Sequence, residues 1–232
     1  MNSADIQLVF LPPIGSDERA YYKQVSLPFR VITPKHIEWL DGESLPEHAK
    51  RYYAHLTAAG VVDPGKPIVW CGLSLGGAIA QEFSALHSPM GQVLLGTFAS
   101  NRELTPVIKI AGHVAHHIPL ALFKLGGHIA PLVMRAIGYM EPHDIDLMIA
   151  GYREQNKRSF RNAFRALADW RGAGYNPNIP TLRIHGRKDP LIPIGRIPHV
   201  DLVLDTMHLV TLAKPVEVNR SVIDFVSRLS VR

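Results

Sequence analysis

Ser74 lies where a buried strand is predicted to turn abruptly into a helix. It stands in Gly72-Leu73-Ser74-Leu75-Gly76-Gly77, after the apolar run Ile68–Cys71 and before small and apolar residues at helical spacing. Such a turn crowds its central residue, and glycines on both sides relieve that crowding. The turn pushes the serine out at the carboxyl edge of the sheet, where open α/β folds bind ligands. A plain glycine-rich turn is the alternative, but the flanking patterns favour a nucleophile.

A serine hydroxyl is a weak nucleophile near neutral pH, so it needs a base to take its proton and a carboxylate to orient that base. His208 and Asp189 fit these roles, because they follow the strand-like runs Val200–Leu204 and Thr181–His185. Both side chains should therefore reach the same sheet edge as the serine. A plain Asp-Pro turn is the alternative reading of Asp189, and Asp205 is a competing acid.

The elements that must position these residues alternate along the chain. Strand-sized apolar runs are Ile6–Leu11, Phe29–Thr33, Ile68–Cys71, Gln92–Leu95, Thr181–His185 and Val200–Leu204. Helical patterns lie at Glu18–Gln24, Leu45–Ala59, Leu75–His87, Ser159–Trp170 and Pro215–Ser230. Uniformly apolar strands that alternate with helices predict an α/β fold with a mainly parallel central sheet flanked by helices.

The segment 101–151 interrupts this alternation, because it has helical character and no convincing strand. We expect it to form a helical cap over one end of the sheet. The predicted organisation is a core of residues 1–100 and 152–232 with the cap, 101–151, inserted in it.

Four stretches of the chain resemble the α/β-hydrolase superfamily, and together they span nearly its whole length. "VFLPPIGSDERAYYKQV" is similar to the first catalytic loop, "GLSLGG" to the nucleophile elbow, "LRIHGRKDPLIP" to the strand and turn with the acid, and "DTMHLVTLAKPVEVNRSVIDFV" to the histidine loop. Their order is the order of the family. The resemblance implies a triad of Ser74, Asp189 and His208. The chain departs from the pattern at Met207, where similar families usually have glycine.

Acyl transfer also needs N–H donors for the oxyanion of the tetrahedral intermediate. One should be the backbone N–H of Leu75, at the start of a helix, where N–H groups are free. The other should come from Pro12-Pro13-Ile14-Gly15, where related hydrolases often carry His-Gly. Because proline has no N–H, we assign this role to Ile14, with Gly15 next in line.

The predicted function is that of a serine hydrolase that cleaves a carboxylic ester through an acyl-enzyme. Apolar cap residues indicate a hydrophobic acyl or aryl group in the pocket: Ile110, Leu120, Leu122, Phe123, Leu125, Ile129, Leu132, Val133, Met134 and Ile137. An acyl thioesterase is the second reading, because basic residues between Arg153 and Arg165 could hold a phosphorylated carrier. A carbon–carbon bond hydrolase and a receptor-like homologue that only binds its ligand are further alternatives.

We expect no cofactor and no metal. His113 and His117 have a spacing that metal sites use, but no glutamate follows His113 and no third ligand is evident. Nucleic-acid binding is not expected either, because the basic residues are not interleaved with aromatic ones in a recognisable module.

The lone cysteine, Cys71, ends an apolar run, which predicts a buried thiol in a reducing compartment. No signal peptide is apparent before the strand that begins at Ile6, so we expect a cytoplasmic protein. Charged residues and prolines break the apolar stretch 107–134, which excludes a membrane-spanning helix there. Similar enzymes have two or three strands ahead of Ile6. An exposed edge strand would then be shielded in another way, as in a homodimer.

Overall fold

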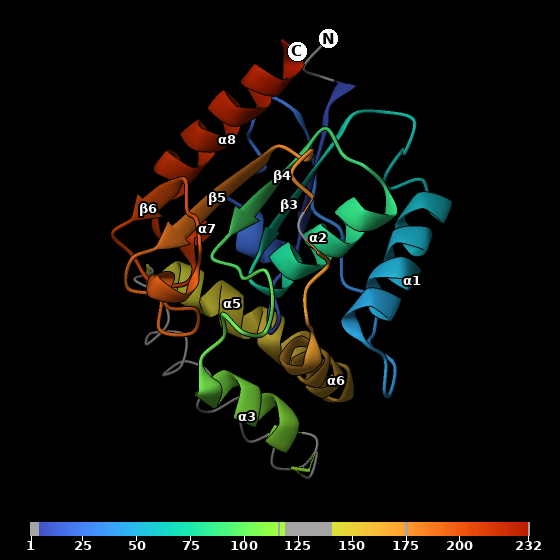
Figure 1. Cartoon of the computed structure of the whole chain (residues 1–232), viewed down its shortest axis with the longest axis vertical. Helices are drawn as coiled ribbons and strands as arrows, with labels where there is room; N and C mark the ends of the chain where they lie inside the picture. Colours follow the sequence, from blue (N-terminus) through green and yellow to red (C-terminus); the bar gives the residue numbers. More distant parts are fainter. Residues whose placement is uncertain (1–4, 116, 119–140, 175, 232) are drawn as a thin grey trace.

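The central sheet is parallel throughout. The structure is a computed structural model that describes residues 5–115, 117–118, 141–174 and 176–231. Within these residues six strands pair in the order β2-β1-β3-β4-β5-β6, and every neighbouring pair is parallel (Figure 1). The strands are β1 (Gln7–Leu11), β2 (Arg30–Ile32), β3 (Ile68–Leu73), β4 (Gly91–Leu95), β5 (Thr181–Gly186) and β6 (Leu202–Leu204). The α/β prediction is confirmed.

Helices cover both faces of this sheet. Helices α1 (Leu45–Ala58) and α2 (Leu75–Leu86) pack on one face, and α7 (Val210–Ala213) and α8 (Pro215–Ser230) pack on the other. Successive residues of a strand point to opposite faces, so Val9 and Leu11 of β1 join the first core while Leu8 and Phe10 join the second. Uniformly apolar strands are therefore needed, because both faces are dry.

The helices α3 (Pro106–Ala115), α5 (Pro142–Glu154) and α6 (Lys157–Asp169) lie beyond the carboxyl ends of the strands (Figure 1). A Cβ added to Gly112 of α3 would stand 2.5 Å from the Ala168 Cβ of α6, so these two helices are in close contact. Helix α5 is anchored to the core by the buried Asp144, whose carboxylate accepts hydrogen bonds from Tyr22 (2.6 Å) and Lys23 (2.8 Å). This helix continues through residue 151, where the expected cap ends.

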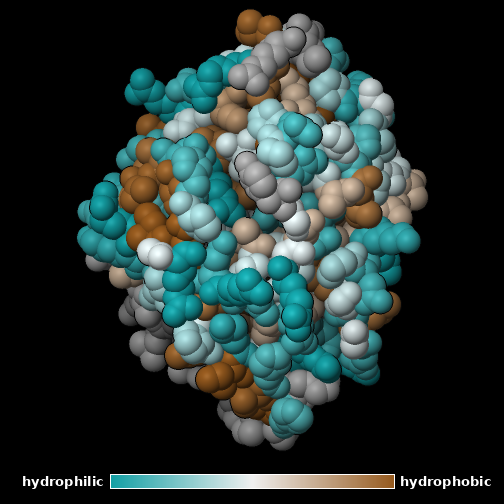
Figure 2. All heavy atoms as spheres, in the orientation of Figure 1, coloured by the Kyte–Doolittle hydropathy of each residue, from teal (hydrophilic) through white to brown (hydrophobic). Residues whose placement is uncertain are grey.

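Most of the apolar cap residues on which the pocket prediction depends, including Leu122 and Phe123, lie outside the described residues. Of the ten, Ile110 is described, and it is exposed on α3 together with Val107 and Val114. Figure 2 shows a hydrophobic group at this end of the molecule, over α3, on a face that is otherwise mostly hydrophilic.

One expectation about the N-terminal part needs correction. The helical pattern at Glu18–Gln24 forms only a short 3₁₀ helix, η2 (Glu18–Tyr21). The edge strand on this side of the sheet is the three-residue β2, which pairs with β1. A short edge strand offers little backbone for pairing with another chain. A homodimer stays a prediction. No helix in the described part of the chain is long and apolar enough to cross a bilayer.

Candidate active site

Ser74 joins β3 directly to α2 in a strained turn. Its φ of 55° and ψ of −119° make it the one non-glycine residue with positive φ in the described part of the chain. Side chains strongly disfavour this region, and such strain clusters at functional sites. Gly76 allows the close approach behind the turn, since an added Cβ would stand 1.9 Å from the Leu11 oxygen of β1. The turn places the serine beyond the carboxyl end of β3.

The backbone of Ser74 is held from both sides. Its N–H donates to the Leu95 oxygen of β4 at 3.0 Å, and the buried Thr97 hydroxyl donates to the Ser74 oxygen at 2.6 Å. Sequence reasoning missed Thr97, because nothing in its local pattern marks it. These two bonds fix the turn against the neighbouring strand.

Asp189 and His208 form a buried hydrogen-bonded pair. His208 Nδ1 lies 2.7 Å from Asp189 Oδ2, and the two residues are 3% and 4% exposed. Asp205, the competing acid, is exposed instead and pairs with Lys188 at 3.0 Å. The carboxylate that contacts the histidine is therefore that of Asp189.

The Asp189 carboxylate is hydrogen bonded through both of its oxygens. Its Oδ1 accepts from the N–H groups of Leu191 (2.9 Å) and Ile192 (3.0 Å), and His185 Nε2 lies 3.2 Å from Oδ2. Although burial alone would raise the pKa of Asp189, the charge interaction with His208 and these hydrogen bonds lower it below its usual range. The side chain is thus an oriented anion. His185 was not predicted, although it ends the strand that carries the acid.

The loop with His208 crosses the end of the sheet to reach the elbow. A Cβ on Gly186, at the end of β5, would stand 2.0 Å from the Met207 oxygen. A Cβ on Gly96, at the end of β4, would stand 2.7 Å from the His208 oxygen and 3.3 Å from Leu73 Cδ1. The loop from β6 therefore runs back over β5 and β4 toward the strand that ends in Ser74.

Ser74 and His208 share this edge, but no hydrogen bond joins their side chains within the described residues. Catalytic hydrogen bonds are often long before a substrate binds and tighten in the complex. The assignment of Ser74 as nucleophile and His208 as base thus stays a prediction.

The loop after β1 is braced beside the elbow by His36. His36 Nε2 lies 3.2 Å from the Pro13 oxygen. Since a carbonyl only accepts, Nε2 carries the proton. The carbonyl of Pro13 and the N–H of Ile14 belong to one planar trans peptide and point in opposite directions. A hydrogen bond on one side thus fixes the direction of the N–H that we predict to bind the oxyanion.

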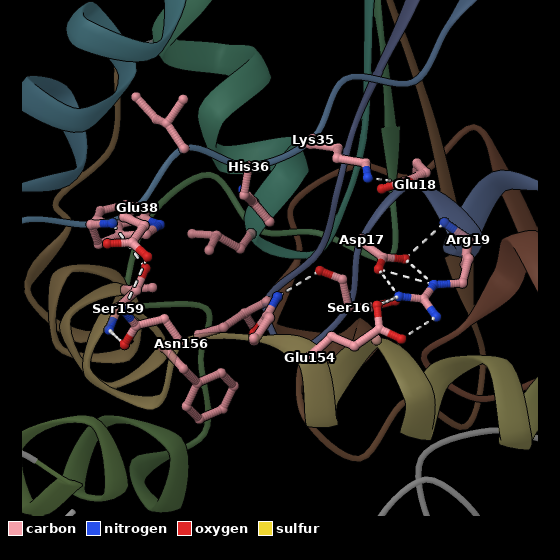
Figure 3. Close-up of a pocket in the computed structure, with 18 residues that line it drawn as sticks. Ser16, Asp17, Glu18, Arg19, Lys35, His36, Glu38, Glu154, Asn156 and Ser159 are labelled. Atoms are coloured by element: carbon pink, nitrogen blue, oxygen red, sulfur yellow. Dashed lines mark hydrogen bonds and ion pairs between the residues drawn. The ribbon is translucent and has the colours of Figure 1, made fainter.

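Ile14 and Leu75 line one cavity of about 270 Å³. Its other walls come from η2, from the segment Lys35–Trp39 and from helices α5 and α6 (Figure 3). Ser74, Asp189 and His208 are not among its lining residues. Among the predicted site residues, Asp189 and His208 therefore lie together. Ile14 and Leu75, the predicted oxyanion donors, line one cavity.

Charged and polar side chains form part of the lining of that cavity. Arg19 Nε donates to Asp17 at 2.9 Å and Arg19 Nη1 donates to Glu154 at 3.2 Å. Glu38 accepts from Asn156 at 3.0 Å. Hydrogen bonds from Arg19 lower the pKa of Glu154, and they also lower the pKa of Asp17, although burial opposes this. Apolar side chains line it as well, namely Ile14, Ile37, Trp39, Leu75, Phe160 and Ala163. Most of the apolar cap residues expected in the pocket lie outside the described residues.

Three of the five basic residues between Arg153 and Arg165 have acidic or aromatic partners, which weakens the phosphate reading. Arg158 pairs with Asp41, Arg165 lies 3.7 Å from Asp169, and the Lys157 amine lies over the Tyr152 ring. His113 faces Asp169 at 3.7 Å. In the described ranges, no three His, Cys, Asp or Glu side chains are grouped to hold a metal ion.

No curated protein matches the chain, but solved structures share its fold. Among solved structures, an esterase from Thermogutta terrifontis superimposes with a TM-score of 0.78 at 18% identity, covering 98% of this chain and 92% of that one. A hydrolase from Pseudomonas aeruginosa has a TM-score of 0.71 at 19% identity (97% and 91%). The enol-lactonase from Burkholderia xenovorans has a TM-score of 0.72 at 17% identity (98% and 92%). At these identities the likeness extends to the fold alone.

The sequence itself matches a family model. The alpha/beta hydrolase family model covers residues 8–221, from the first strand into the last helix. The segments that carry Ser74, Asp189 and His208 all lie inside this range. The chain therefore belongs to the alpha/beta hydrolase family.

Proposed function

We propose that the protein is a serine hydrolase that cleaves carboxylic esters through an acyl-enzyme. The observation that carries the proposal is the buried Asp189–His208 pair at the sheet edge where Ser74 holds a strained turn. An oriented carboxylate fixes the tautomer of the imidazole and leaves Nε2 free to accept a proton.

A residue can then be assigned to each step of ester hydrolysis. Ser74 Oγ attacks the ester carbonyl carbon while its proton passes to His208 Nε2, and the carbonyl electron pair moves to the oxygen. The N–H groups of Leu75 and Ile14 donate to that oxyanion. Collapse of the intermediate breaks the ester bond, and the departing alcohol takes the proton from His208. Water then repeats the sequence on the acyl-serine and releases the acid.

The test is hydrolysis of p-nitrophenyl acetate and butyrate by the wild type and by Ser74→Ala. We expect turnover that is lost in the variant, together with a fluorophosphonate adduct that maps to Ser74. Turnover that survives in Ser74→Ala would reject the proposed nucleophile. Clean binding of esters without turnover would favour a receptor-like protein.

A thioester remains the second candidate reaction, since the same three residues could cleave it. Its expected carrier site is weakened by the ion pairs of Arg158 and Arg165. A comparison of acetyl-CoA with p-nitrophenyl acetate decides between the two reactions.

We assign residues 101–151 to a cap over this site. The position of α3 and α5 beyond the strand ends supports this assignment. A cap of this kind would exclude water and shape the pocket. Its apolar residues would then contact a hydrophobic acyl or aryl group of the ester.

A further inference from the structure

A second buried imidazole lies against the carboxylate of Asp189, and the proposed reaction does not use it. His185 Nε2 lies 3.2 Å from Asp189 Oδ2, the same oxygen that lies 2.7 Å from His208 Nδ1. His185 is 2% exposed, so its ring is almost completely removed from water. Burial of a polar ring costs free energy unless its polar atoms have partners. The contacts of this ring therefore need an explanation.

The position of the His185 proton follows from a second contact of the same nitrogen. His185 Nε2 also lies 2.8 Å from the Ile192 oxygen. A carbonyl oxygen only accepts hydrogen bonds, so Nε2 carries a proton. The N–H group donates to Ile192, and the same edge of the ring lies next to Asp189 Oδ2. At this atom His185 can thus act on the acid only as a donor.

The turn that carries Asp189 faces solvent on its outer side. Asp189 and Ile192 are buried, whereas their neighbours in the turn are exposed, namely Arg187, Lys188 and Pro190. Solvated turns are mobile unless their backbone is fixed to the rest of the fold. The bond from His185 to Ile192 joins the end of β5 to the far end of this turn. It therefore closes the turn around the acid.

Ile192 links this closure to the acid itself. Its oxygen accepts from His185, while its N–H donates to Asp189 Oδ1 at 3.0 Å, beside the N–H of Leu191. His185 thus acts on both oxygens of the acid, on Oδ1 through Ile192 and on Oδ2 directly. A carboxylate that is held at both oxygens keeps its plane. Its Oδ2 then stays directed at His208.

The electrostatics of the acid agree with this arrangement. Burial raises the pKa of Asp189, but the charge interaction with His208 lowers it and the contact with His185 lowers it further. A donor beside a carboxylate oxygen stabilises the ionised form. His185 thus helps to keep the acid an anion in a buried place.

We infer that His185 is a positioning residue, whose Nε2–H group holds Ile192 and Asp189 so that the acid meets His208 Nδ1 at 2.7 Å. The inference rests on the proposed function, because the orientation of Asp189 affects turnover only if His208 is the base. A displacement of about 1 Å from the productive geometry can lower a rate about a hundredfold. The competing explanation is that His185 only fills space at the end of β5.

The bond between acid and base can be observed without turnover. In Ser74→Ala, the Nδ1 proton of His208 should give a low-field ¹H resonance, because it lies in a short bond to a buried carboxylate. The loss of this resonance in His208→Ala identifies it. His185→Leu should shift or broaden it, whereas His185→Gln, whose amide can still donate, should keep it. His48→Leu, at an equally buried histidine outside the site, should leave it unchanged.

Kinetics test the same point in the active enzyme. With p-nitrophenyl butyrate, His185→Leu should lower kcat by about ten- to a hundredfold and leave KM unchanged, since this side chain does not contact the ester. His185→Gln should recover most of kcat. His185→Asn should not, because its amide is one methylene shorter, and it keeps a polar group in place if the leucine variant does not fold.

The outcomes separate positioning from packing. An unchanged resonance in His185→Leu, or a loss that appears in KM alone, would overturn the inference. Equal losses of kcat in His185→Gln and His185→Leu, each with a lower melting temperature, would mean that the ring only fills space and would overturn it too. If the resonance responds as expected but Ser74→Ala is as active as the wild type, the proposed function fails and the positioning of Asp189 by His185 stands.

Discussion

Two buried histidine–carboxylate pairs in this molecule look alike and differ in what surrounds them. In one, His208 Nδ1 lies 2.7 Å from Asp189; in the other, His48 Nδ1 lies 3.1 Å from Glu43. Both histidines are nearly inaccessible, 3% and 0% exposed. The type of pair alone therefore does not mark a catalytic site.

The competing partners of the carboxylate separate the two pairs. Arg51 donates to Glu43 at 2.7 and 2.8 Å, so a permanent cation already neutralises that acid. His48 stacks on Trp39 with ring centroids 3.5 Å apart, and burial lowers its pKa to about 4 despite the contact with Glu43. Among the described residues, two backbone N–H groups and two histidines contact the Asp189 carboxylate, and no arginine pairs with it. The negative charge of Asp189 can therefore stabilise a protonated His208, whereas the negative charge of Glu43 is already paired with Arg51.

Removal of His208 and removal of His48 should have very different effects on turnover. His208→Ala should lower kcat/KM for p-nitrophenyl butyrate by roughly three orders of magnitude or more, like Ser74→Ala. His48→Gln should change it by less than about tenfold and act mainly on stability. The double variant Ser74→Ala/His208→Ala should be hardly worse than either single one. Equal losses from the two histidine variants would mean that both pairs serve catalysis.

Removing the charge of the acid is the next test. Asp189→Asn should reduce kcat by roughly two to four orders of magnitude, because the imidazole loses its orienting anion. The control is Asp205→Asn, on the exposed acid that faces Lys188, and it should stay within twofold of the wild type. If Asp205→Asn instead abolishes turnover while Asp189→Asn is active, the acid has been assigned wrongly.

The pH dependence of stability should show that His48 is neutral in the folded protein. With a pKa of about 4 in the fold and about 6.5 when unfolded, His48 takes up a proton on unfolding between these values. The free energy of unfolding should therefore fall by up to about 3 kcal/mol as the pH drops from 6.5 to 4. Urea unfolding of wild type and His48→Gln over this range isolates the effect, since other groups cancel in the difference. A difference that does not vary with pH would contradict a neutral His48.

The smallest expected effect comes from the support of the elbow. Thr97→Val removes the hydroxyl that donates to the Ser74 oxygen. The N–H groups of Gly77 and Ala78 still donate to this oxygen, so the loss of one hydrogen bond should cost about 1 kcal/mol of stability. Turnover should fall modestly, because the turn loses one of its two fixed points. Thermal unfolding and kcat measure both, and Thr57→Val, on the surface of α1, serves as the control. Unchanged stability in Thr97→Val would show that the elbow does not depend on this bond.

Sequence patterns predicted much of this molecule because the signals were local. The apolar runs that became strands, and the glycines around Ser74, need only neighbouring residues to be recognised. Contacts between distant segments left no such mark. The bonds of Thr97 to Ser74 and of His36 to Pro13 are set by how strands and loops meet in space. For the same reason the pattern at Glu18–Gln24 predicts a helix, whereas the structure has one 3₁₀ turn there, followed by Tyr22 and Lys23, which donate to Asp144 of the distant α5.

The hydroxyl of Tyr21 has a consequence for where a cleft can open in this fold. It accepts from the N–H of Leu73 at 2.7 Å and donates to the oxygen of Leu11 at 2.6 Å. These two backbone groups end β3 and β1, the strands between which the chain reverses its direction of travel across the sheet. A single phenol oxygen therefore acts as a spacer that parts the two strands by the width of one atom while both backbone groups keep a partner. The two strands thus separate at their carboxyl ends, just before the loop with Ile14 and the turn with Leu75, and neither backbone group is left unpaired.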